Sequence, residues 1–212
     1  ATANRSSSVV MNGGEICNNN SEESIPIIDL SRDSAANTTS FTMNSGSIHD
    51  NTTRWRTIAM PYTMTGVNTS DKHIFNMNGG TIANNKVEKG VAGIDVFSGT
   101  FTMTGGSIEN NTSTEGCGGV GLRGDHAVAE ITGGNISGNT GRNGGGIRLE
   151  KGHLTVDGAS VSNNTVTANG GGGGVLLEGG TMELKNGTVS GNRTASNVGG
   201  GGILLKGGTL NM

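Results

Sequence analysis

The chain is built from one sequence unit that recurs along nearly all of its 212 residues. The copies are VVMNGGEICNN (9–19), FTMNSGSIHDN (41–51), FNMNGGTIANN (75–85), FTMTGGSIENN (101–111), AEITGGNISGN (129–139), LTVDGASVSNN (154–164) and MELKNGTVSGN (182–192). The third position of each copy is an apolar anchor, and with one more in a partial eighth copy the anchors are Met11, Met43, Met77, Met103, Ile131, Val156, Leu184 and Met212. Successive anchors lie 25 to 34 residues apart, and the two longest intervals come first. Such a period is typical of a solenoid, in which each repeat packs on its neighbours.

Apolar residues occupy fixed positions around each anchor and alternate with polar ones. Two positions before the anchor lie Val9, Phe41, Phe75, Phe101, Ala129, Leu154, Met182 and Leu210. Five positions after it lie Ile16, Ile48, Ile82, Ile108, Ile136, Val161 and Val189. This alternation predicts two short, half-buried strands in each repeat. Because stacked repeats bring identical positions together, we expect the three phenylalanines to form an interior stack.

Two further columns of residues predict how the chain bends. Three positions after the anchor stands a small residue, which suits a bend with positive φ; the column is Gly14, Gly46, Gly80, Gly106, Gly134, Ala159 and Gly187. Eight positions after the anchor every complete copy carries asparagine, at Asn19, Asn51, Asn85, Asn111, Asn139, Asn164 and Asn192. Stacked asparagines can form an amide ladder, and asparagine tolerates left-handed turn geometry. We therefore expect a structural role for this column.

A third strand is expected in the segments GIDVF, GGIRLEKG, GGVLLEGG and GGILLKGG. Their leading apolar residues are Ile94, Ile147, Val175 and Ile203, and Val120 joins this column after allowance for two extra residues around Asp125-His126. Three short strands and three bends in about 28 residues predict one coil of a parallel β-helix. Residues 1–212 are therefore expected to form a single all-β solenoid of about seven coils, with insertions at about 20–40 and 52–73.

The composition agrees with a solenoid and excludes several other folds. Glycine supplies 40 residues, whereas aromatic residues make up 3% of the chain. Abundant Gly, Asn, Ser and Thr oppose a helical bundle, and glycine does not recur at every third position as it does in collagen. No apolar run reaches the roughly 18 residues of a membrane helix, so we expect no membrane insertion by this segment.

These motifs resemble those of right-handed parallel β-helix repeat proteins of the pectate-lyase-like superfamily. The repeats are most similar to those of bacterial cell-surface and adhesin-like proteins of the polymorphic outer membrane protein type. That type combines a GGA[ILV] motif with an F-x-x-N motif. Gly145-Gly146-Ile147 corresponds to the first motif, and Ile108 to Asn111 corresponds to the second with isoleucine in place of phenylalanine. The resemblance implies a right-handed, single-stranded β-helix, a fold that serves adhesins and stalks as well as lyases and glycosidases.

The second insertion holds the strongest candidate for a binding site. It contains Arg54, Trp55, Arg56 and Tyr62, and the chain has no other Trp or Tyr. Exposed aromatic side chains beside arginines can stack on a sugar ring or anchor a protein partner. The alternative is that Trp55 and Tyr62 fold down and cover the flank or the N-terminal mouth of the solenoid.

The third strand carries the candidates for acid–base chemistry. Its outward positions hold Asp95, Arg148, Glu150, Glu178 and Lys206. Two glutamates one coil apart would suit the carboxylate pair of a glycosidase. We favour a structural interpretation, in which Lys206 and Lys151 offset the charges of Glu178 and Glu150.

The cysteines and histidines predict neither a disulfide nor a metal centre. Cys17 and Cys117 fall three to four coils apart, too far for a disulfide, so we expect two free thiols. The four histidines, His49, His73, His126 and His153, are scattered along the sequence, so we expect no metal and no cofactor.

Together these patterns favour a non-catalytic, extracellular protein of a microbial cell surface: a stalk, a filament or an adhesin segment. The expected partners are host or environmental glycans or cell-surface proteins. Met11 and Met212 occupy equivalent positions, so head-to-tail self-association is also expected. The net charge of −3 without a basic stripe argues against nucleic-acid binding. The alternative is a polysaccharide-acting β-helix enzyme, either a lyase or a glycosidase.

Overall fold

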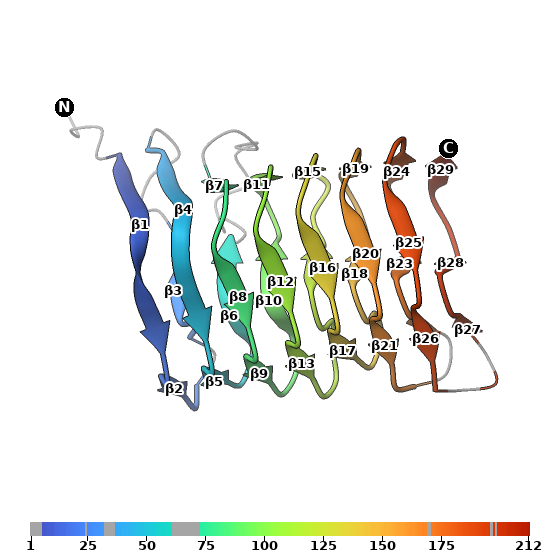
Figure 1. Ribbon diagram of the computed structural model, residues 1–212, viewed down its shortest axis with the longest axis horizontal. Coiled ribbons are helices and arrows are strands. Elements are labelled where there is room, and N and C mark those ends of the chain that lie inside the picture. The colour runs from blue at the N-terminus through green and yellow to red at the C-terminus, as the bar shows by residue number, and fades with distance from the viewer. Residues whose placement is uncertain are drawn as a thin grey trace.

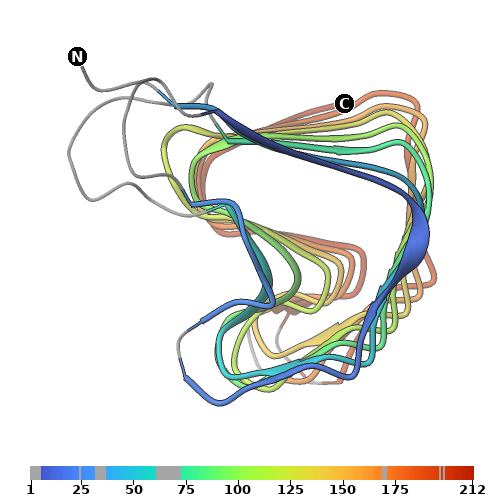
Figure 2. The same ribbon diagram turned by 90° about the vertical axis from the view of Figure 1, so that its left-hand side faces the viewer.

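The computed structural model describes residues 6–23, 25–31, 37–60, 73–168, 171–195, 197 and 199–212. These residues form parallel strands stacked in about seven turns with a spacing of roughly 28 residues, which confirms the β-solenoid (Figure 1). Viewed from the N-terminal end, the chain turns clockwise as it recedes, so the solenoid is right-handed (Figure 2). The described residues contain no helix, and therefore none that could cross a membrane.

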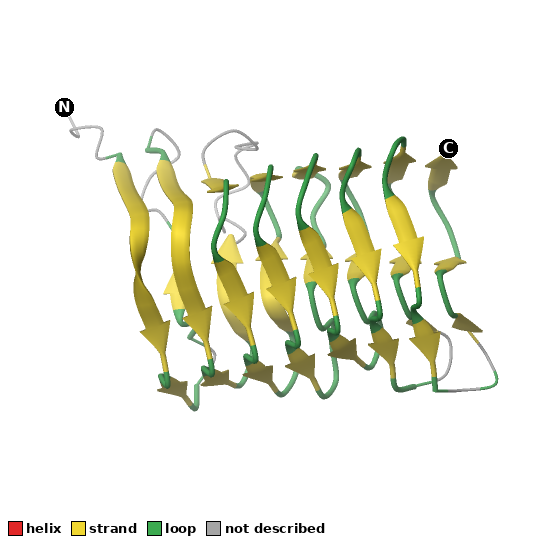
Figure 3. Cartoon of the chain, in the orientation of Figure 1, coloured by secondary structure: helices red, strands yellow, loops and turns green. Residues whose placement is uncertain are grey.

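The largest sheet, here named the anchor sheet, has thirteen strands and contains the first two strands of each coil. The strands that carry the anchors are β1 (Ser7–Cys17), β4 (Thr39–His49), β7 (His73–Met77), β11 (Gly99–Met103), β15 (Ala127–Ile131), β19 (His153–Val156), β24 (Thr181–Leu184) and β29 (Thr209–Asn211). The strands that follow the bend are β8 (Thr81–Ala83), β12 (Ser107–Glu109), β16 (Asn135–Ser137), β20 (Ser160–Ser162) and β25 (Thr188–Ser190). β1 and β4 run through both positions without a break (Figure 3).

The third strands form a seven-stranded parallel sheet, here named the third-strand sheet. Its members are β3 (Ile28–Asp29), β6 (Arg56–Met60), β10 (Val91–Val96), β14 (Val120–Leu122), β18 (Ile147–Leu149), β23 (Val175–Leu177) and β28 (Ile203–Leu205). Val120 pairs with Ile94 and Ile147, as the sequence predicts. Two glycine strands, β22 (Gly171–Gly172) and β27 (Gly199–Gly200), pair with each other just ahead of β23 and β28.

A fourth sheet was not predicted from the sequence. Its seven strands follow directly after the asparagine column, and we name it the corner sheet. They are β2 (Asn20–Ser21), β5 (Thr52–Thr53), β9 (Lys86–Val87), β13 (Thr112–Ser113), β17 (Thr140–Gly141), β21 (Thr165–Val166) and β26 (Arg193–Thr194). Each coil therefore has four strands and not three. Two residues are too few to show an alternation, which explains why the pattern gives no sign of them.

The two supposed insertions contain regular parts of the solenoid. Within 20–40, β3 occupies the third-strand position of the first coil, and within 52–73, β6 occupies that of the second. Ile28 and Ile58 thus extend the column that begins with Ile94 in the sequence-based assignment. In both segments most of the residues between the third strand and the next anchor strand lie outside the described residues. Asp125-His126 lies at the same corner, between β14 and β15.

The interior is filled by the predicted apolar columns. Phe41, Phe75 and Phe101 are buried and stack with ring-centroid distances of 5.0 and 5.5 Å, which confirms the expected stack. The asparagine ladder is also confirmed. From Asn51 to Asn164 its members are fully buried, and each side-chain amide donates to the side-chain oxygen of the next asparagine at 2.9 to 3.1 Å.

The asparagine ladder lies at a turn in each coil. The residue with left-handed backbone conformation in that turn comes one position before the ladder asparagine. Positive φ occurs at Asn18, Asp50, Asn84, Asn110, Gly138, Asn163 and Gly191, one position before each ladder asparagine. The ladder residue is thereby free to point its amide inward. The predicted bend column has positive φ from Gly14 to Gly134, but in the sixth coil the positive φ moves from Ala159 to its neighbour Gly158, which has no Cβ.

Candidate functional site

The residues predicted to form a binding site do not come together in one place but contact different side chains of the solenoid. Arg54 and Trp55 lie in the turn between β5 and β6, and Arg56 begins β6. Arg54 Nε lies 3.7 Å from a Glu88 carboxylate oxygen. The Trp55 ring is half-buried, with Lys89 Nζ at 6.0 Å from its centroid. Arg56 contacts Asp95 on the third-strand sheet instead, and Tyr62 lies outside the described residues.

A shallow groove runs over the outer face of the corner sheet. Its volume is about 490 Å³, and it crosses the first four coils, from β2 to β13. The charged side chains in it are Glu22, Arg54, Lys86 and Glu88, and asparagine, serine and threonine residues and Val87 line the rest. Arg54 is thus the predicted site residue that lines this open polar surface.

Asp95 is the centre of a compact ion cluster on the outer face of the third-strand sheet. Its carboxylate accepts a hydrogen bond from Arg123 Nε at 2.8 Å and forms further ion pairs with Arg123 and Arg56. Only 1% of the Asp95 side chain is exposed, although the sequence places it at an outward position. Burial opposes the charge on Arg123, but the charge and hydrogen bonds of Asp95 outweigh it and raise the pKa of the guanidinium.

The carboxylates of Glu150 and Glu178 are bridged by one arginine. Arg148 donates to Glu178 at 2.8 Å and lies 2.8 Å from Glu150. Lys206 pairs with Glu178 at 3.4 Å, as expected, whereas Lys151 pairs with Asp125 and not with Glu150. The lysine expected to neutralise Glu150 is therefore replaced by an arginine from the same coil.

Both cysteines are free thiols, as predicted, but their surroundings differ. Cys117 is fully buried, and burial raises its pKa to about 12. Its Sγ donates to the carbonyl oxygen of Val120 at 3.3 Å. Cys17 lies on the outer side of β1 and is partly exposed. Cys17 is therefore the thiol that solutes can reach.

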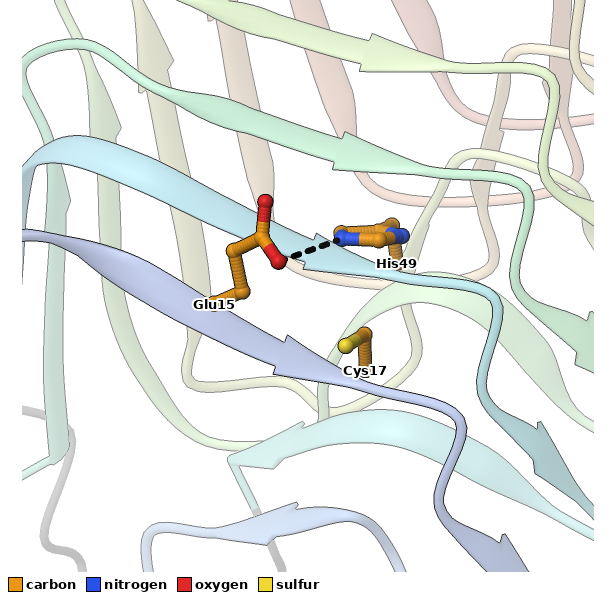
Figure 4. Close-up of side chains that lie close together, drawn as sticks. All are labelled: Glu15, Cys17 and His49. Atoms are coloured by element: carbon orange, nitrogen blue, oxygen red, sulfur yellow. Dashed lines mark ion pairs between the residues drawn. The ribbon is translucent and has the colours of Figure 1, made fainter.

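Glu15, Cys17 and His49 form a cluster that sequence reasoning missed (Figure 4). One potential ligand atom from each lies within 4.8 Å of the others. The histidines are scattered along the chain, but the coil length brings His49 of β4 beside Cys17 of β1 as its register partner. The available signal was the column position, since both residues stand six positions after their anchors.

Comparison with models of known protein families found no match to this chain. Comparisons with curated proteins and with solved structures found no significant match either.

Proposed function

We propose that this chain is a non-catalytic, extracellular structural or adhesive protein of a microbial surface, acting as a stalk, filament or adhesin segment. The resemblance of its repeats to those of the polymorphic outer membrane protein type supports this proposal. The observation that carries it is the polar groove of the corner sheet, an open surface fixed on a buried asparagine ladder. A rigid solenoid with such a surface can bind an extended ligand without rearranging.

The outer columns of the anchor sheet support a structural role. The outward row in the middle of the anchor strands is in register from coil to coil and consists of Thr42, Asn76, Thr102, Glu130, Thr155 and Glu183. Within this row the Thr102 hydroxyl donates to the Asn76 side-chain oxygen at 2.6 Å. A row of polar and charged groups gives a hydrated surface that resists aggregation.

The ligand that fits the groove is a glycan. Its lining side chains are hydroxyl, amide and charged groups of both signs, with Val87 as the apolar exception. The polar groups can bond the hydroxyls of a sugar chain, and the apolar surface between them can pack against the faces of its rings. Arg54 supplies a planar set of donors in the groove, and Trp55 follows directly in the chain. Arg54 and Trp55 are therefore the residues we assign to glycan contact.

Binding can be followed directly because Trp55 is the only tryptophan. Titration with a panel of neutral and acidic polysaccharides should change its fluorescence, and Arg54→Ala should weaken binding by about tenfold or more. Arg142→Ala is the matched control, since it removes an exposed arginine from the same column three coils further on, outside the groove. Equal binding by wild type and Arg54→Ala, or no binding to any member of the panel, would refute the assignment.

The acids of the third-strand sheet do not favour the enzymatic alternative. Glu150 and Glu178 would be the carboxylate pair, but Arg148 bridges them through contacts of 2.8 Å to each. A glycosidic bond has to lie between the two carboxyl groups that cleave it. The guanidinium occupies that position, so this arrangement fits an ion-paired edge of the sheet.

A further inference from the structure

We propose that Glu15, Cys17 and His49 form a zinc-binding site on the outer face of the first two coils. A thiolate, an imidazole and a carboxylate are the ligand types that zinc takes from proteins. The three side chains come from two adjacent parallel strands, Glu15 and Cys17 from β1 and His49 from β4. This site is independent of the glycan groove, which lies on the corner sheet.

The backbone register creates the cluster. Cys17 and His49 are direct partners across the two strands, and Glu15 pairs with Ser47 two residues earlier on the same face. Side chains two residues apart on a strand point to the same side. The three ligands therefore project outward from one small patch of sheet, and none of them has to leave its strand to meet a metal ion (Figure 4).

The distances suit a tetrahedral ion after small side-chain adjustments. The His49 Nε2 atom lies 3.8 Å from Glu15 Oε2, and all three ligand atoms lie within 4.8 Å of one another. Zinc bonds of about 2.0 to 2.3 Å place tetrahedral ligand atoms about 3.3 to 3.8 Å apart. Glu15 is 66% exposed, so its side chain can move by the remaining ångström without disturbing the core. Three protein ligands leave a fourth position for water.

A fourth residue fixes the imidazole in the orientation that a metal needs. His49 Nδ1 lies 2.6 Å from Asp50 Oδ2, a hydrogen bond in which the ring donates its proton to the carboxylate. This bond leaves Nε2, which faces Glu15, as the ring nitrogen available to a metal ion. Zinc-bound histidines usually carry such a carboxylate partner on the other nitrogen. Asp50 is therefore a positioning residue.

The rest of the same columns shows that this combination belongs to the first two coils. The Cys17 column continues as His49, Ala83, Glu109, Ser137, Ser162 and Ser190. The Glu15 column continues as Ser47, Thr81, Ser107, Asn135, Ser160 and Thr188. Among these register partners, a thiol and an imidazole stand side by side only at Cys17 and His49.

Cobalt(II) is the appropriate first probe, because a thiolate bound to it gives a charge-transfer band and tetrahedral geometry gives intense visible bands. The full chain should bind one equivalent of Co²⁺ with both signals, and Zn²⁺ should displace it. Cys17→Ser should abolish the charge-transfer band, and His49→Gln should strongly weaken binding. The buried Cys117 cannot mimic this signal, because its thiol is inaccessible and its pKa is raised to about 12.

Two further variants test the geometry. Asp50→Asn should keep the charge-transfer band but lower the affinity for Zn²⁺ by about 10- to 100-fold, as expected for a residue that orients a ligand. Glu109→Gln is the matched control, since it removes a carboxylate from the Cys17 column two coils beyond His49 and should leave binding unchanged. Circular dichroism of each variant verifies that the solenoid is intact.

Metal binding by the variants decides whether the zinc site exists. Loss of the charge-transfer band in Cys17→Ser, with Glu109→Gln unaffected, supports the site. The proposal is overturned if the wild-type chain binds neither ion at micromolar concentration. It is equally overturned if folded Cys17→Ser and His49→Gln bind both ions as tightly as wild type. Glycan binding through Arg54 is measured without metal, so failure of either proposal leaves the other unaffected.

Discussion

Each interior asparagine of the ladder has all its hydrogen-bonding capacity used. Asn111 donates its side-chain amide to Asn139 Oδ1 at 3.0 Å and to the Ile82 carbonyl at 2.9 Å. Its own side-chain oxygen accepts from the backbone and the side chain of Asn85 at 3.1 and 2.9 Å. A buried polar group without such partners costs about 1–3 kcal/mol. The ladder is therefore a stability element and not a ligand site.

Asn111→Ala should lower the free energy of unfolding by about 3 kcal/mol, because several buried partners lose their bonds at once. Urea unfolding monitored by circular dichroism measures this. Asn78→Ala is the matched control: Asn78 is exposed and donates to Asn44 at 2.8 Å, so its loss should cost no more than about 0.5 kcal/mol. Equal destabilisation by the two substitutions would show that the buried ladder has no special role.

The sequence predicts single residues well where a column repeats, and poorly where a contact depends on the path of the chain. The asparagine column, the phenylalanine stack and the two free thiols follow from position in the repeat alone. The burial of Asp95 does not, because it depends on Arg56 and Arg123 reaching across from neighbouring coils. The pairing of Glu150 with Arg148 in place of Lys151 likewise does not follow from position in the repeat.

At the scale of the strands, the bend glycines show why the coils fit so closely. Gly106 has a φ of +86°, and a Cβ atom there would lie 2.6 Å from the carbonyl oxygen of Gly80 in the preceding coil. Gly14 has nearly the same φ, +80°, but belongs to the first described coil, and a Cβ there would meet nothing within 4 Å. A substitution at Gly14 therefore tests the backbone strain alone. The same substitution at Gly106 tests that strain together with steric contact between coils.

Gly14→Ala should cost about 1 kcal/mol, the price of a left-handed conformation for alanine. Gly106→Ala should cost at least about 2 kcal/mol more, because the nearest atoms belong to the backbone of the preceding coil, which cannot turn aside as a flexible side chain can. Thermal or urea unfolding of the two variants gives the difference. If both lose the same stability, close contact between successive bends does not limit the packing of the coils.

The sequence predicts strands where the alternation of apolar and polar residues extends over enough positions to be recognised. Anchor strands of four or more residues are clear, whereas the two-residue strands of the corner sheet carry no periodic signal. The third strands β3 and β6 were missed for another reason: extra residues at the following corner displace them from the regular spacing to the next anchor. Counting residues back from the next anchor therefore misplaces a strand when extra residues lie between the two, even if the rest of that coil is regular.

At the scale of the whole molecule, the expected head-to-tail association concerns the first and last described coils. In the described part of the chain, Asn19 donates to Asn51 but receives no ladder bond, and Asn192 receives bonds from Asn164 but has no asparagine beyond it. Exposed apolar side chains occur at both ends, Val9 and Val10 at one and Leu205 and Met212 at the other. Stacking of copies would extend the ladder and cover these residues.

Light scattering should therefore detect species larger than the monomer, with a fraction that rises with protein concentration. Leu205→Lys should reduce this assembly, because it places a charge in the expected contact. Glu130→Lys is a control of exposed polar character on a middle coil. A strictly monomeric wild-type chain at high concentration would argue against head-to-tail stacking.

We propose that this solenoid binds its ligands on its surface and does not catalyse a reaction. The most direct test is to incubate the chain with acidic and neutral polysaccharides and to measure new reducing ends and unsaturated products, alongside binding. We expect binding that depends on Arg54 and no cleavage of any member of the panel. Cleavage that disappears in Glu178→Gln, with the fold retained, would contradict it and establish the third-strand sheet as a catalytic surface.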